Sequence, residues 1–174
     1  YNIFACNGIL FNHESPLRGE TFVTKKIVSA LCKISLSGTG NLYLGNLYSK
    51  RDWGHAKDYV LAMWKMLQRK NPKDYVIASG KQYSVKYFVN LICDILKIKI
   101  YWKGKGINEK AYWNGKVIIS IDKKYFRPTE VDSLLGDSSK ARKELRWKPL
   151  YNIKSLAQDM VAEEFKKIHV NKKK

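Results

Sequence analysis

The chain has 174 residues, of which 45% are apolar and 13% aromatic, so it can bury a core and wholesale disorder is excluded. Lys and Arg outnumber Asp and Glu by 33 to 15, a formal charge of +18 at pH 7. This excess predicts attraction to polyanions: nucleic acid, an anionic membrane surface or phosphate-bearing small molecules. No apolar stretch approaches the roughly 20 residues that a membrane span needs, and no signal peptide opens the chain.

The three cysteines, Cys6, Cys32 and Cys93, each sit in an apolar run, and their odd number prevents complete pairing. We therefore expect buried free thiols in a reducing compartment, and hence a cytoplasmic protein. The three histidines are far apart in sequence and show no metal-ligand spacing, so no metal site is predicted.

Strand and helix patterns alternate along the chain, which predicts an α/β or α+β fold. Residues 2–11 form an apolar run typical of a strand buried in a parallel sheet. A polar loop at 13–20 follows, and helical spacing of apolar residues then predicts a helix over 23–34 with its lysines off the apolar stripe. A second helix is expected over 55–69, where Asn71-Pro72 stops it.

In that second helix we expect Tyr59, Val60, Met63 and Leu67 to form the buried face. The remaining predicted elements are strands at 42–44, 75–78, 98–102 and 117–121, helices at 84–96, 129–136, 137–149 and 152–165, and a polar loop at 103–115.

Cations beside turns and helix starts are the first candidates for ligand binding. Arg18 follows the first strand, and ligands bind at the carboxyl ends of strands in open α/β sheets. Lys25 and Lys26 lie in the first turn of the next helix, where backbone N–H groups and the helix dipole favour anions. Arg51 precedes another helix in the segment RDWGH. Solvated surface cations are the alternative reading for each of these residues.

Arg127 and Glu130 form a further candidate pair, because Phe126 and Pro128 restrict the backbone on both sides of Arg127. A guanidinium suits phosphate oxygens and a carboxylate suits vicinal hydroxyls. The chain carries no Walker loop, no G-x-G-x-x-G and no G-x-S-x-G, so it displays no complete catalytic constellation of its own.

Five segments together resemble the C-terminal part of the GDP-mannose 4,6-dehydratases, a family of extended short-chain dehydrogenases. These segments are NGILFNHESPLRGETFVTKKI, LYLGNLYSKRDWGHAKDYVLAMW, DYVIASG, YFRPTEVDSLLGD and LRWKP. The resemblance implies an α/β fold that is the C-terminal, substrate-binding half of such an enzyme and opens with a strand of the Rossmann sheet, the N-terminal cofactor half being missing. It implies boundaries of 1–14 for the end of the NADP-binding domain and 15–174 for the nucleotide-sugar domain, whose short strands cross back.

In the family, hydride passes from C4 of GDP-mannose to NADP, water is lost across C5–C6, and hydride returns to C6. The product, GDP-4-dehydro-6-deoxy-mannose, is the precursor of GDP-fucose. The resemblance places the family's glycine fingerprint, Tyr-x-x-x-Lys pair and other catalytic residues upstream of Tyr1, so no catalytic residue is expected in this chain. It also implies homo-oligomers, dimers or tetramers, of a complete enzyme with no membrane association.

Residue by residue, the resemblance carries over binding roles. His13 and Arg18 match positions that contact NADP. The positions that match contacts to GDP-mannose are Asn12, Lys26, Arg51, Arg127 and Glu130. Leu17 departs from the family, whose members usually carry a second Arg in SPRRGE.

Three alternatives stay open from sequence. Within the same superfamily, a GDP-sugar epimerase or reductase would bind a similar ligand, although FNHESP and RDWGHAKDYV favour the dehydratase. A basic nucleic-acid-binding module would explain the charge of +18, but only six of the 33 cations are Arg and the Lys residues are scattered. An inactive remnant would keep the family's fold without turnover and would expose apolar surface.

Overall fold

The computed structural model describes residues 1–126, 129 and 131–171, and the chain divides into two compact units. The first unit holds Tyr1–Ser15, Lys50–Tyr83 and Ser133–Leu156. The second unit holds Pro16–Ser49, Ser84–Asp132 and the residues from Ala157 on. Each unit is thus assembled from three separate stretches of the chain, and the domain boundary expected after residue 14 stays a prediction.

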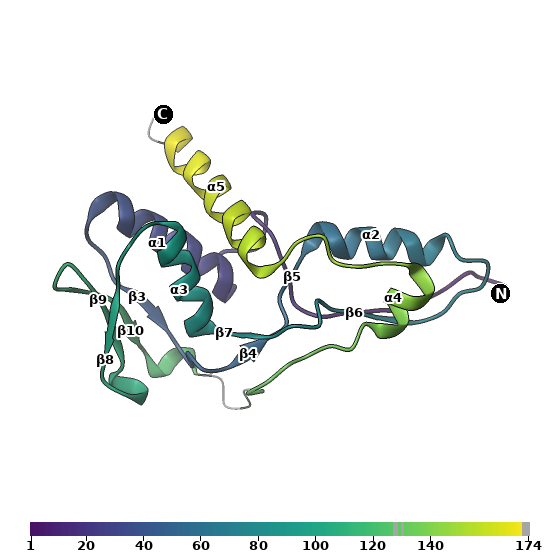
Figure 1. The fold of residues 1–174 in the computed structure, drawn as a ribbon, viewed down its shortest axis with the longest axis horizontal. Coiled ribbons are helices and arrows are strands. Elements are labelled where there is room, and N and C mark those ends of the chain that lie inside the picture. Colours follow the sequence, from purple (N-terminus) through teal and green to yellow (C-terminus); the bar gives the residue numbers. More distant parts are fainter. Residues whose placement is uncertain (127–128, 130, 172–174) are drawn as a thin grey trace. The chain divides into compact units, whose positions relative to one another are not determined.

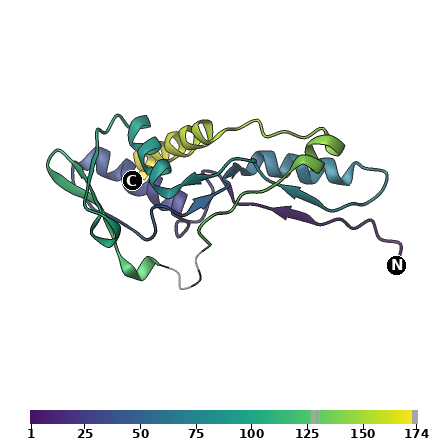
Figure 2. The same ribbon diagram turned by 60° about the horizontal axis from the view of Figure 1, so that its bottom comes forward.

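The first unit contains short parallel strand pairs and two helices (Figure 1). Its elements are β1 (Gly8–Leu10), β2 (His13–Glu14), β4 (Lys50–Arg51), β5 (Gly54–His55), α2 (Ala56–Leu67), β6 (Tyr75–Ile77), β7 (Tyr83–Ser84), α4 (Ser139–Leu145) and the start of α5 (Ile153–Asn171). β1 pairs in parallel with β6, and β2 pairs in parallel with β5. Figure 2 shows α2 running beside the β1–β6 pair.

The core of the first unit forms where α2 meets β6 and α4. Tyr59 and Ala62 of α2 are fully buried, and they pack with Tyr75 and Ile77 of β6 and with Trp147. The indole N–H of Trp147 donates a hydrogen bond of 2.9 Å to the carbonyl oxygen of Asp58, so the ring is buried with its polar atom satisfied.

The first strand is shorter and more exposed than its apolar sequence suggests. Only Gly8–Leu10 form β1, the side chain of Ile9 is 55% exposed and that of Ile3 is 73% exposed. Within the described residues β1 pairs along one edge only, with β6. The prediction of a strand buried over 2–11 was therefore wrong, because a parallel strand is buried only where neighbours cover its second edge and both its faces.

The predicted buried face of the second helix is confirmed at Tyr59 and wrong at its other three residues. Its inward residues are Tyr59, Ala62 and Met66, whereas Trp64 is 58% exposed and Leu67 59% exposed. Val60 and Met63 are also exposed, so the helix carries apolar residues on its outer side as well as on its inner side, and hydrophobicity alone could not indicate which side faces the core. We call this outer stripe, Val60, Met63, Trp64 and Leu67, the α2 apolar face.

We expect the α2 apolar face to bind an environment-sensitive dye such as anilinonaphthalene sulfonate while the chain is folded, because contiguous exposed apolar surface attracts such probes. Changing Trp64 and Leu67 to Gln should lower dye fluorescence without lowering the melting temperature. Val170→Gln, an exposed apolar residue on another helix, is the matched control. A folded wild-type chain that does not increase the fluorescence of the dye would contradict this expectation.

The second unit is a four-stranded sheet with helices packed on it (Figure 1). Its elements are α1 (Val23–Ser37), β3 (Leu42–Leu44), α3 (Val85–Ile95), β8 (Tyr101–Lys103), the 3₁₀ turns η1 (Gly106–Asn108) and η2 (Lys123–Tyr125), β9 (Lys110–Trp113), β10 (Lys116–Ile121) and most of α5. The strand order is β3-β10-β9-β8, with β3 parallel to β10 and the other pairs antiparallel. The predicted helix at 84–96 is confirmed, since Ser84 caps α3 by accepting a hydrogen bond from the N–H of Tyr87.

A buried ion pair lies in the second unit. Lys25 of α1 is only 2% exposed, and its Nζ lies 2.5 Å from Oε2 of Glu164 on α5. The expectation that Lys25 points off the buried stripe and offers its charge to an anion was therefore wrong. Apolar periodicity could not show this, because the partner carboxylate is 139 residues away in sequence.

Two further sequence predictions need correction. The expected polar loop at 103–115 contains η1 and β9, and β9 turns into β10 through Asn114 and Gly115, both with positive φ. Asn-Gly is the preferred dipeptide of a two-residue hairpin turn, so that signal was present in the sequence. The helix expected at 129–136 is not seen among the described residues of that segment, where Ser133 instead forms a bridge with Lys50.

The cysteines are free, with Cys32 and Cys93 buried and Cys6 partly buried. Burial raises the pKa of both buried thiols to about 12, so neither is a reactive thiolate at neutral pH. None of the helices in the described part of the chain is both long and apolar enough to cross a membrane.

Candidate functional site

In the first unit, the segment that contains Asn12 and His13 lies beside the RDWGH segment. β2 and β5 pair in parallel with His13 opposite Gly54, and the N–H of Gly54 donates a 2.9 Å hydrogen bond to the carbonyl oxygen of Asn12. Arg51 lies three residues before Gly54, on β4. The structure therefore brings together the backbones that carry three of the seven predicted binding residues.

His13 is held in a defined orientation. Its Nδ1 lies 2.9 Å from the carbonyl oxygen of Phe11, and its ring stacks on Tyr59 with 5.0 Å between ring centroids. A carbonyl oxygen only accepts hydrogen bonds, so Nδ1 is the donor in this contact and carries a proton. His13 is half-buried, which leaves part of the ring able to meet a ligand.

Gly54 has to be a glycine because of the tyrosine beside it. A Cβ at this position would lie 2.3 Å from Cε2 of Tyr59, far inside van der Waals contact. Tyr59 cannot easily yield, since it is fully buried between His13 and Trp147. Burial and the nearby carboxylates of Asp52 and Asp58 raise its pKa, so this phenol stays protonated.

Arg51 lies at the edge of the first unit. Its Nη1 donates a 2.9 Å hydrogen bond to the carbonyl oxygen of Lys50, and the side chain is half-buried. This bond to the backbone helps to orient the guanidinium, whose planar arrangement of N–H donors is the chemistry that matches phosphate oxygens.

Asp52 is a residue of this segment that sequence reasoning missed. Its carboxylate is completely buried and accepts backbone N–H groups from three residues. Oδ1 accepts from Ser79 at 2.8 Å, and Oδ2 accepts from Gly80 at 2.9 Å and from Gly136 at 3.3 Å. Asp52 thereby fixes the loop after β6 and the segment before α4 relative to RDWGH. The sequence signal for it was weak, because only the fold places a carboxylate opposite those amides.

In the second unit, Lys26 and Arg18 each rest on an aromatic ring. Nζ of Lys26 lies 3.4 Å from the ring centroid of Tyr125 and donates a 2.6 Å hydrogen bond to the carbonyl oxygen of Tyr43. The guanidinium of Arg18 lies 3.5 Å from the ring centroid of Phe22. These cation–π contacts help to hold the two cations in place.

Arg127 and Glu130 lie outside the described residues, so their predicted roles stay predictions. The residue that contacts Lys26, Tyr125, precedes Arg127 by two positions. A Cβ on Gly45 would lie 2.4 Å from the carbonyl oxygen of Tyr125, so a glycine is required where β3 ends against this segment.

The spacing Tyr-x-x-x-Lys does occur twice, at Tyr101–Lys105 and Tyr112–Lys116. Both pairs belong to the β8–β9–β10 hairpins rather than to a helix, where residues four apart would be neighbours. Tyr101 and Tyr112 stack on each other, with 5.3 Å between ring centroids, and this accounts for the two tyrosines as sheet residues. Among the described residues, no three His, Cys, Asp or Glu side chains gather where they could hold a metal ion.

Solved structures show which class of protein has this fold. RMD from Pseudomonas aeruginosa complexed with NADPH matches 91% of this chain and 47% of its own, with a TM-score of 0.73 and 17% identity. dTDP-glucose 4,6-dehydratase from Bacillus anthracis in complex with NAD matches 94% of this chain and 45% of its own, with a TM-score of 0.71 and 17% identity. The chain thus has the α/β fold of the extended short-chain dehydrogenases, as expected from sequence.

Sequence relatives define the family within that class. The family model for GDP-mannose 4,6 dehydratase matches residues 1–160. A GDP-mannose 4,6 dehydratase of Drosophila melanogaster is 53% identical over 98% of this chain and 44% of its own length, and GDP-mannose 4,6 dehydratase 2 of Caenorhabditis elegans is 52% identical over 94% and 43%. The chain belongs to the GDP-mannose 4,6-dehydratase family, and it spans a little under half the length of these curated relatives.

Proposed function

We propose that this chain supplies the nucleotide-sugar-binding part of an NADP-dependent GDP-mannose 4,6-dehydratase, which converts GDP-mannose to GDP-4-dehydro-6-deoxy-mannose on the way to GDP-fucose. Membership of the family is the observation that carries this proposal. The pairing of β2 with β5 supports it, because it aligns the predicted cofactor residue His13 with the segment of the predicted substrate residue Arg51.

Each predicted binding residue has a role that its chemistry fits. Arg51, Lys26 and Arg127 would hold the diphosphate, Glu130 the ribose hydroxyls or the guanine edge, and Asn12 a sugar or phosphate oxygen. Residues 1–14 would complete the NADP-binding domain, and residues 15–174 would form the nucleotide-sugar domain. We further propose that the complete enzyme is a cytoplasmic homo-oligomer.

The residues present fit a phosphorylated dinucleotide. The guanidinium of Arg18 is held on the ring of Phe22, and Nδ1 of His13 is hydrogen-bonded to the carbonyl oxygen of Phe11, so the other ring nitrogen, Nε2, is the one that can face a ligand. We propose that Arg18 binds a cofactor phosphate and that His13 accepts a hydrogen bond from the cofactor. When bound, NADP supplies the hydride chemistry of the reaction. The residues of this chain would bind and orient, and no catalytic group is assigned to them.

We expect Arg51→Ala to weaken GDP-mannose binding by about 1.5–3 kcal/mol, because it removes a charge-assisted hydrogen bond to phosphate. The measurement is calorimetry on the chain alone and on the chain completed with the N-terminal part of the Drosophila melanogaster relative. Arg69→Ala, which changes an exposed Arg beyond the end of α2, is the matched control. Equal affinity in wild type and Arg51→Ala would show that the diphosphate lies elsewhere.

The same titration tests the nucleotide class. GDP-mannose should bind in preference to UDP-glucose and dTDP-glucose, and the absence of a guanine preference would count against the proposed function. A filter-binding assay with DNA and RNA covers the basic-module alternative, which requires tight binding that falls steeply with salt.

A further inference from the structure

A hollow lies in the first unit, outside the predicted nucleotide-sugar site. It has a volume of about 430 Å³ and is walled by the loop after β6, by Arg142 of α4 and by the segment that leads into α5. None of the predicted binding residues lines it. Its volume falls in the range of small-molecule sites and exceeds what a bare phosphate ion would fill.

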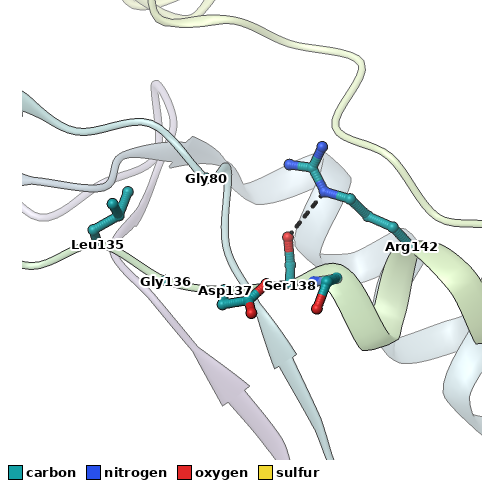
Figure 3. Close-up of a pocket in the computed structure, with 7 residues that line it drawn as sticks. Gly80, Leu135, Gly136, Asp137, Ser138 and Arg142 are labelled. Atoms are coloured by element: carbon teal, nitrogen blue, oxygen red, sulfur yellow. Dashed lines mark hydrogen bonds between the residues drawn. The ribbon is translucent and has the colours of Figure 1, made fainter.

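The lining is cationic. Lys81, Arg142 and Lys148 all contribute to the wall, and no Asp or Glu is among the lining residues. An adjoining hollow shares Gly80 and Arg142 but includes Asp137 (Figure 3). The backbone N–H of Ser139 donates to that carboxylate and lowers its pKa, so Asp137 is ionised and repels anions from the adjoining hollow. The hollow that contains Lys148 is therefore the one suited to an anion.

Arg142 is positioned before any ligand arrives. Its Nε donates a 3.1 Å hydrogen bond to Oγ of Ser138, drawn in Figure 3, and its Nη2 donates a 2.8 Å hydrogen bond to the carbonyl oxygen of Ser79. Two of its five N–H donors are thus used, and three remain for an anion. Gly80 has a φ of +77°, and a Cβ there would lie 3.0 Å from Nη2, so glycine leaves the room in which the guanidinium lies.

The aromatic part of the wall is also fixed. The ring of Tyr151 stacks on His55 with 3.9 Å between centroids, and the backbone N–H of Tyr151 donates a 3.0 Å hydrogen bond to Oδ2 of Asp58. Trp53 lines the same hollow and is only 2% exposed, so its position is set by packing. Of these two rings, the partly exposed Tyr151 is the one that can contact a flat ligand, and because it is already held in place the contact costs little conformational entropy.

We propose that this hollow binds a phosphate monoester carried on a flat ring, the class to which nucleoside monophosphates belong, with Arg142 and Lys148 on the phosphate and the tyrosine-lined wall against the ring. The phosphate takes the three free guanidinium donors and the cationic field, and the ring accounts for the remaining volume. This site is separate from the proposed GDP-mannose site and does not depend on that proposal.

The test is a titration of the ¹⁵N-labelled full chain with AMP, which avoids the guanine preference of the proposed substrate site. Amide resonances of Gly80, Lys81 and Tyr151 should shift together and saturate. Adenosine and inorganic phosphate, titrated separately, should each bind at least tenfold more weakly than AMP. Inorganic phosphate that binds as tightly as AMP would overturn the ring part of the proposal.

Variants test whether the positive charges of Arg142 and Lys148 are responsible for AMP binding. Arg142→Gln and Lys148→Gln should each weaken AMP about tenfold, whereas Lys143→Gln, an exposed neighbour outside the hollow, should leave the affinity unchanged. Lys148→Gln guards against loss of the fold, because the exposed Lys148 side chain makes no hydrogen bond with the described residues. Unchanged affinity in both variants, shifts confined to other amides, or no shift at all would each overturn the proposal.

Discussion

Replacing Glu164 by Gln is expected to lower the free energy of unfolding by about 3–5 kcal/mol, the usual cost of leaving one charge of a buried ion pair without its partner. Nζ of Lys25 lies 2.5 Å from Oε2 of Glu164, and the two side chains are 2% and 8% exposed. The Gln side chain keeps the volume and one oxygen, so the loss reports charge rather than packing. Urea unfolding followed by tryptophan fluorescence measures it.

Glu163→Gln is the matched control on the same helix. Glu163 pairs with Lys166 one turn along, but these side chains are 38% and 70% exposed, so little change in stability is expected. The double variant Lys25→Met with Glu164→Leu should recover most of the stability, because apolar residues of similar volume replace buried ion pairs well. A loss in Glu163→Gln as large as that in Glu164→Gln would contradict the burial argument.

The Lys25–Glu164 ion pair also makes the stability of the fold depend on pH in the acidic range. Burial by itself raises the pKa of Glu164, but the hydrogen bond from Lys25 and its positive charge outweigh burial and hold this pKa below its usual value. A carboxylate with a lowered folded pKa stabilises the fold above its unfolded pKa of about 4.3 and loses that contribution as pH falls through the folded value. Wild type should therefore lose stability more steeply than Glu164→Gln below about pH 4.

Local patterns predicted the elements whose signals lie within a few residues. Ser84 as a cap, the apolar spacing of Val23 to Ile34 and the glycine that ends α1 all act within one or two turns, and α1 and α3 are confirmed. The missed strand β9 was also local, since the turn Asn114-Gly115 specifies its hairpin. The prediction that failed was which side of α2 faces the core. Val60 and Ala62 are both apolar, and only the position of β6 and Trp147 decides that Ala62 is the one that is buried.

In the candidate site, too, some residues could be identified from sequence and others could not. Arg18, Lys26 and Arg51 were identifiable because cations next to turns and helix starts have few structural uses, whereas Lys25 fits the same pattern and is an ion-paired core residue. Family resemblance located His13 and Asn12, and the structure adds the strand pairing that aligns them with RDWGH. Neither the local pattern nor the family resemblance identified Asp52, because its carboxylate acts by accepting hydrogen bonds from three backbone amides that are 27 to 84 residues away in sequence.

Asp52→Ala is expected to destabilise the first unit by about 3 kcal/mol or more, since hydrogen bonds to a charged group contribute about 1.5–3 kcal/mol each and this carboxylate accepts three. Ser79 and Gly80 follow β6, and Gly136 precedes α4, so losing the carboxylate releases both segments at once. Hydrogen exchange at these three amides, followed by NMR, measures the effect residue by residue. Exchange at Ile92 of α3, in the second unit, gives the internal reference.

Asp52→Asn separates charge from geometry. The amide keeps one oxygen acceptor, so it can retain a bond to one or two of the three N–H groups, and its loss of stability should lie between wild type and Asp52→Ala. Asp94→Ala, an exposed aspartate on α3, should leave all three exchange rates unchanged. Because Asp52 sits between Arg51 and Trp53, its removal should also displace the guanidinium and weaken GDP-mannose in the completed enzyme even where the fold survives. Unchanged hydrogen-exchange rates at Ser79, Gly80 and Gly136 in Asp52→Ala would mean that these loops keep their structure without the carboxylate. Asp52 would then have no organising role.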